Sequence, residues 1–77
     1  MLTSIIERLR DKRILIAGFG REGRSSLRFM QKYLPDTEVA VADKNEMSLK
    51  EIDKNKYHVY YGDEYLLSAH HYDIVIK

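Results

Sequence analysis

The sequence contains no cysteine and no tryptophan, and only one of its 77 residues is a proline. The lack of cysteine excludes disulfides, thiolate metal sites and thiol chemistry, and it is compatible with the cytoplasmic location that we expect. No apolar run approaches the roughly 18 residues of a membrane-spanning helix, and charged residues interrupt the apolar pattern of the first ten residues, so we expect no secretory signal. Thirteen basic residues balance twelve acidic ones, which gives no reason to expect nucleic acid or a membrane as a partner.

Helical and strand-like patterns alternate along the chain. Short apolar or β-branched runs predict strands, and apolar residues at helical spacing predict helices between them. We expect strands at 13–17, 38–42, 57–61 and 72–76, and helices at 2–9, 23–34, 48–53 and 63–69. In the first helix Ser4 and Glu7 have the spacing of a capping box, and Asp63 is a candidate cap for the last. This alternation predicts an α/β fold, an open parallel sheet of about four strands with flanking helices.

A glycine-rich loop follows the first expected strand. Gly18, Gly20 and Gly23 form a Gly-x-Gly-x-x-Gly motif between that strand and the next helix. In this setting the first glycine permits a tight turn, the second lets a phosphate approach the backbone, and the third lets the helix pack closely on the strand. The free amides and dipole of the helix N-terminus favour an anion there. The motif therefore predicts a Rossmann-like, nucleotide-binding fold, although it does not say which nucleotide is bound.

An acidic residue stands where such a site needs one. Asp43 follows Gly23 by 20 residues and lies at the tip of the second expected strand. Its carboxylate can accept hydrogen bonds from ribose hydroxyls or from the imide of a pyrimidine base. We therefore expect Asp43 to contact the nucleoside.

Four segments together resemble the N-terminal domain of the Mur ligases, in particular those that add D-glutamate. They are Lys12–Ser25, Val41–Lys44, Tyr60–Gly62 and Tyr72–Lys77. The resemblance implies that residues 1–77 are a Rossmann-like UDP-substrate-binding domain, the N-terminal fragment of a longer three-domain ligase of peptidoglycan synthesis. That enzyme would use ATP and Mg²⁺ to join UDP-N-acetylmuramoyl-L-alanine to D-glutamate. No GxxxxGK[ST] loop occurs in this sequence, so the fragment alone is expected to be non-catalytic.

The resemblance also assigns residues. Gly18, Gly20 and Gly23 would contact the diphosphate through backbone amides, with Arg21 and Glu22 beside it in the loop, and Asp43 and Lys44 would hold the uracil and ribose. Glu22 departs from the Ser or Thr of many family members. Its carboxylate would repel a diphosphate unless it turned outward or paired with Arg21 or Arg24, so a backbone contact is implied at this position.

Other residue types have simpler explanations than catalysis or binding. Tyr57 and Tyr61 share strand parity, which favours packing in the core or at a sheet edge over base stacking. His70 and His71 are adjacent, so we expect their rings to point apart in a solvated turn, without a metal. His58 is expected on a strand surface. The alternative function is an NAD-binding regulatory domain of the potassium-transporter type, which shares the Gly-Phe-Gly-Arg-x-Gly loop and the Tyr-Gly-Asp turn. A dehydrogenase is a third, weaker reading.

Overall fold

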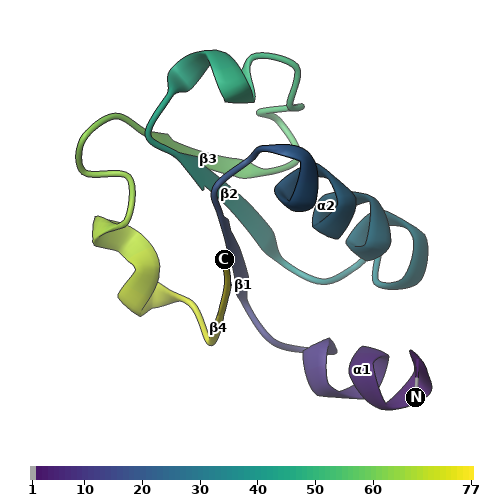
Figure 1. Ribbon diagram of the computed structural model, residues 1–77. Coiled ribbons are helices and arrows are strands. Elements are labelled where there is room, and N and C mark those ends of the chain that lie inside the picture. Colours follow the sequence, from purple (N-terminus) through teal and green to yellow (C-terminus); the bar gives the residue numbers. More distant parts are fainter. Residues whose placement is uncertain (1) are drawn as a thin grey trace.

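The apolar runs form one four-stranded parallel sheet in the computed structural model, which describes residues 2–77 (Figure 1). The strands are β1 (Ile14–Ala17), β2 (Val39–Asp43), β3 (His58–Tyr61) and β4 (Ile74–Ile76). Their order in the sheet is β3-β2-β1-β4, so the two most buried strands, β1 and β2, lie in the centre. The predicted α/β fold with an open, Rossmann-like parallel sheet is confirmed.

Two α-helices accompany the sheet, α1 (Leu2–Leu9) and α2 (Arg21–Tyr33). Helix α2 connects β1 to β2 and buries Gly23, Leu27 and Met30 on its inner side. It ends before Pro35, because proline disfavours helical geometry in the residue that precedes it. The glycine loop therefore lies between the central strand β1 and the helix α2, which are packed against each other.

Alternation along the strands divides the core between the two faces of the sheet. Ile14, Ile16 and Val41 point to the α2 face, together with Leu27 and Met30. The second face is built on the fully buried Leu15, Ala40 and Ala42, with partly buried tyrosines packed against them. The small alanines leave room for the tyrosine rings. Both faces of β1 and β2 are covered, which is why these strands read as continuous apolar runs.

On that second face, a pair of tyrosines joins the edge strand β3 to the segment that precedes the other edge strand, β4. The Tyr60 and Tyr72 hydroxyls are 2.9 Å apart, with the rings edge to face. Burial raises the pKa of Tyr72 above its ordinary value, and the hydrogen bond with Tyr60 raises it further. Both effects favour the neutral phenol of Tyr72, and its hydrogen bond with Tyr60 links the region of β3 to the segment before β4.

The starts of β1 and β4 are clamped by one carboxylate. The Arg13 amide donates to Oδ2 of Asp73 at 2.8 Å, and the Arg13 Nε lies 3.6 Å from the same oxygen. The Asp73 amide in turn donates to the Arg13 carbonyl at 2.8 Å. The Arg13 amide and the positive guanidinium lower the pKa of Asp73, with the nearby charge of Lys12 acting in the same direction.

Four of the expected helical features are wrong: the capping box of Ser4 and Glu7, the helix 48–53, the helix 63–69 and its cap Asp63. Ser4 lies inside α1, which already includes Leu2, so Ser4 and Glu7 are not a capping box at its start. The segment 48–53 is not an α-helix; a 3₁₀-helix, η1 (Glu46–Leu49), is capped instead by Asn45, whose Oδ1 accepts from the Met47 amide at 3.0 Å.

The expected helix 63–69 is replaced by a turn and a second 3₁₀-helix, η2 (Leu67–His71), whose N-cap is Leu66 and not Asp63. In the earlier segment, the side chains of Asn45 and Asp53 each accept from the backbone amide two residues ahead. The Asn45 bond caps η1, and the Asp53 bond favours a turn at the end of the expected helix 48–53.

Candidate functional site

The glycine loop begins with a tight turn directly after β1. Gly18 has a φ of +96°, a backbone conformation that side chains disfavour, and its amide donates to the Ala42 carbonyl at 2.7 Å. The turn therefore requires glycine and is held against the end of β2. This confirms the turn expected of the first glycine of the motif. The expected contact of the Gly18 amide with a diphosphate is wrong, because that amide is already bonded to Ala42.

Gly23 brings α2 against this turn. A Cβ built on Gly23 would overlap the backbone carbonyl of Gly18 and would press on the Ile16 side chain. A larger residue would push the helix away from β1. The third glycine is therefore explained by packing alone, as the sequence predicts.

Gly20 differs from the other two glycines because the protein itself does not require it. Its φ of −84° is open to any L-residue, and a Cβ there would meet no atom within 4 Å. Gly20 is the N-cap of α2, and no side chain caps this helix end. Among residues 2–77, the hydrogen bonds include none donated by the amides of Gly20, Arg21, Glu22 or Gly23. The N-terminus of α2 therefore has both empty space beside Gly20 and backbone amides that are free to donate to an anion.

Asp43 lies beside this loop, and its carboxylate already accepts hydrogen bonds from backbone amides. The Phe19 amide donates to Oδ2 of Asp43 at 2.7 Å, and the Asn45 amide donates to Oδ1 at 2.8 Å. Both oxygens already accept one bond each, which ties the middle of the glycine loop to the end of β2. Each oxygen keeps a further lone pair for a ligand donor. The sequence placed Asp43 at this edge but gave no sign of its bond to Phe19.

The charged residues of the candidate site point to solvent. Arg21, Glu22 and Lys44 are all exposed, and no ion pair among residues 2–77 involves them. Of the two alternatives for Glu22, a pairing with Arg21 or Arg24 is not found within residues 2–77, and the side chain is exposed. The Lys44 carbonyl accepts from the Gly62 amide at 3.2 Å, so the turns after β2 and β3 are joined.

Arg24 is occupied within the protein. Its guanidinium lies 4.8 Å from the centroid of the Phe19 ring, and Nη2 donates to the Ser48 carbonyl at 3.2 Å. Phe19 itself is buried among the side chains of the α2 face. Arg24 therefore fixes the loop and η1 to α2, and Arg21 is the loop arginine that remains free for a ligand.

The tyrosines and histidines follow the sequence expectations only in part. Tyr57 is buried as expected, but Tyr61 is 51% exposed and belongs to neither core cluster. His58 is exposed on β3. The rings of His70 and His71 do not point apart: their centroids are 4.0 Å apart, because His70 folds back to place Nδ1 2.9 Å from the Leu67 carbonyl oxygen.

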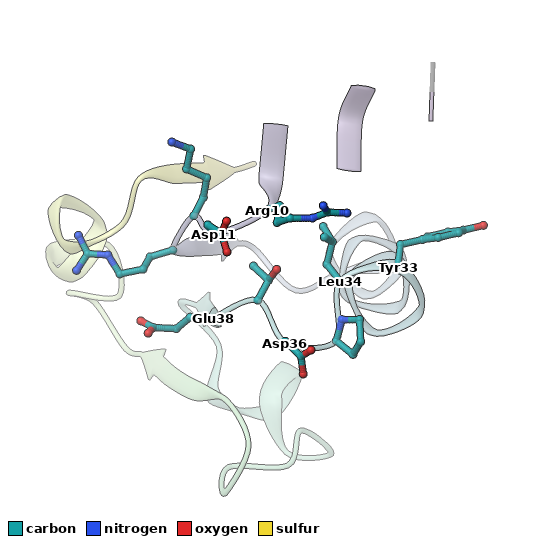
Figure 2. A pocket seen from close by; sticks show the side chains of 10 residues that line it. Arg10, Asp11, Tyr33, Leu34, Asp36 and Glu38 are labelled. Atoms are coloured by element: carbon teal, nitrogen blue, oxygen red, sulfur yellow. The ribbon is translucent and has the colours of Figure 1, made fainter. Parts of the chain in front are cut away.

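A separate cavity of about 520 Å³ lies at the other end of the strands (Figure 2). It is formed by the segments that precede β1 and β2, and its lining includes Arg10, Asp11, Asp36 and Glu38. Charges of both signs share this lining, so it does not favour one class of ion. None of the residues expected to bind a ligand lies there.

The geometry defines an open parallel α/β domain with an uncapped, glycine-lined helix N-terminus at the carboxyl edge of its sheet. No family model matches the sequence, and neither the curated proteins nor the solved structures contain a match to it. Among the helices described within residues 2–77, none has the length and apolar character to cross a membrane. The same residues contain no group of three side chains suited to hold a metal ion.

Proposed function

We propose that this chain binds the UDP part of UDP-N-acetylmuramoyl-L-alanine, as the N-terminal domain of a cytoplasmic Mur ligase that adds D-glutamate. ATP, Mg²⁺ and D-glutamate would be bound by further domains of that enzyme. In this proposal the amides of Gly20 to Gly23 hold the diphosphate, Arg21 adds a positive charge, and Asp43 and Lys44 face the nucleoside. The resemblance of four sequence segments to that family supports the choice of UDP.

The observation that carries the binding proposal is the state of Gly20. Gly18 and Gly23 are required by the turn and by helix packing, but nothing in the protein fills the space at Gly20. The free amides beside it supply donors for an anion, and charge-assisted bonds of this kind are each worth about 1.5–3 kcal/mol. A diphosphate would fill the empty space at Gly20, and its oxygens would accept hydrogen bonds from the free amides.

A matched pair of variants tests the proposal. Gly20→Ala should leave the fold unchanged, because the new Cβ meets no protein atom, yet it should weaken UDP binding at least about tenfold by displacing the phosphates. Titration of the 77-residue chain with UDP, followed by amide chemical shifts, measures the affinity. Leu67→Ala, on exposed η2, is the control and should bind like the wild type. Equal UDP affinity in Gly20→Ala and wild type would contradict the proposal.

The NAD-binding regulatory domain remains the second candidate, since the same loop and acid serve dinucleotides. The connection between β3 and β4 contains only the short η2, whereas the transporter modules usually have a longer helix there, and this favours the ligase reading. A parallel titration with NAD⁺ and NADH separates the two. Binding of NAD(H) without binding of UDP would replace the first proposal by the second.

A further inference from the structure

We propose that Tyr61 is the aromatic surface on which the base of the bound nucleotide stacks. This inference rests on the proposed function, because it names the residue that would recognise the base at the same site. It assigns a role to a side chain that the sequence alone predicted to be packed.

The sheet places Tyr61 directly beside Asp43. The two residues are register partners at the carboxyl ends of the parallel strands β3 and β2. Alternation puts Tyr61 on the same face as Val59, which packs against the α2-face core, and Tyr60 on the other face. Asp43 has the parity of Val41, which also belongs to the α2-face core, so it lies on that same face. An aromatic ring and the acid therefore share one edge and one side of the sheet.

The ring of Tyr61 is free, while its backbone is held. Its side chain is 51% exposed, and within residues 2–77 no aromatic or cationic group packs on it. Gly62, with a φ of +92°, turns the chain immediately afterwards, and its amide is bonded to the Lys44 carbonyl. An aromatic ring is thus exposed to solvent at the end of β3, next to the bond that joins the turns after β2 and β3, and its face is available to a ligand.

The spacing of the strands suits a nucleotide that lies along this edge. The glycine loop follows β1, Asp43 ends β2 and Tyr61 ends β3, and these strands are neighbours in that order. Adjacent strands are about 4.8 Å apart, so the edge spans about 10 Å from the loop to Tyr61. Phosphate, ribose and base follow one another in the same sequence as loop, acid and ring.

The other aromatic side chains near the loop are not available. Phe19 is only 4% exposed and lies under the guanidinium of Arg24, and Tyr57 is 9% exposed. Tyr57 also accepts a hydrogen bond from Gln31 at 3.1 Å. Stacking uses the π-face that every base has, so Tyr61 would accept uracil or adenine, and the selection between them would fall to Asp43 and Lys44.

The test compares UDP with inorganic diphosphate on four proteins: wild type, Tyr61→Ala, Tyr61→Phe and the control Leu67→Ala. We expect Tyr61→Ala to weaken UDP binding about fivefold or more and to leave diphosphate binding unchanged. Tyr61→Phe keeps the ring and should bind UDP like the wild type. The uracil protons should show an upfield ring-current shift on binding to the wild type and to Tyr61→Phe, and none with Tyr61→Ala.

The outcomes separate this inference from the proposed function. If the wild type binds diphosphate and UDP but Tyr61→Ala binds UDP normally, stacking on Tyr61 is refuted and the phosphate site stands. Equal loss of both ligands in Tyr61→Ala would also refute it, since the change would then act on the loop. If the wild type binds neither UDP nor diphosphate, the proposed function fails and the inference fails with it.

Discussion

At the carboxyl edge of β1 and β2, some residues are required by the fold and others are free to contact a ligand. Gly18 and Gly23 are needed by the fold, Gly20 is left for a ligand, and Asp43 holds the loop through the Phe19 amide. The motif predicted the turn at Gly18 and the close helix packing at Gly23, and both are found. The bond from the Phe19 amide to Asp43 was not predictable, because it depends on which atoms the folded loop brings together.

Gly23→Ala should destabilise the fold, because its Cβ would overlap the Gly18 carbonyl, which is backbone and cannot swing aside. Overpacking of this kind costs about 1–3 kcal/mol, which lowers the Tm of a domain of this size by several degrees. Thermal or urea unfolding measures the change. Gly20→Ala is the matched control and should unfold like the wild type; a loss of stability in both variants alike would show that the loop is more crowded than described.

Asp43→Asn should loosen the glycine loop even without ligand. An amide side chain has one acceptor oxygen, so it cannot accept from both the Phe19 and Asn45 amides as the carboxylate does. Loss of about 1 kcal/mol of local stability should make exchange of the Phe19 amide hydrogen about fivefold faster. Asp63→Asn, at an exposed turn, is the control.

Hydrogen exchange also decides between two roles for Asp43. If the Asp43→Asn variant binds UDP more weakly while the Phe19 amide exchanges at the wild-type rate, Asp43 acts on the ligand directly and does not position the loop.

At the scale of elements, the strands and both α-helices were predictable, α1 at the bounds expected for it, and the two 3₁₀-helices were not. The strands and α2 have strong periodicity and match within a residue or two at their ends. The segments of η1 and η2 have weak periodicity, and Asn45 and Asp53 divert the backbone into turns. The sequence placed Asp43 at the tip of β2, but it did not foresee the exposure of Tyr61, because strand parity does not show whether other segments cover the end of the edge strand β3.

The tyrosine pair gives an element-scale prediction. Tyr60→Phe and Tyr72→Phe each leave one partly buried hydroxyl without its partner, so each should lower the unfolding free energy by about 1 kcal/mol. The double variant removes both hydroxyls and should lose less than the sum of the single changes. Urea unfolding of the four proteins completes the cycle. Strict additivity would mean that the 2.9 Å contact contributes no coupling.

The acid sensitivity of the whole molecule should depend on Asp73. Its pKa in the folded protein lies below the ordinary value of 3.8, so its bond to the Arg13 amide stabilises the fold fully at neutral pH. That contribution is lost as the pH falls below the ordinary value and through the lower folded pKa. Asp73→Asn should therefore be less stable than the wild type at neutral pH and show a flatter decline in acid.

Unfolding midpoints measured from neutral to acid pH test this expectation. Asp63→Asn makes the same change of charge at an exposed turn and should keep the wild-type pH profile. Equal flattening in both variants would assign the effect to net charge and not to the clamp between β1 and β4.

The strand order also governs how the chain reaches its native state. Ile14 of β1 pairs with Ile74 of β4, so the central strand finds its second neighbour sixty residues later in the chain. Each strand pairing in a parallel sheet closes a long loop before any contact compensates for the lost chain entropy. We therefore expect folding to be slow for a chain of this length. During synthesis, one side of β1 stays unpaired until β4 has left the ribosome.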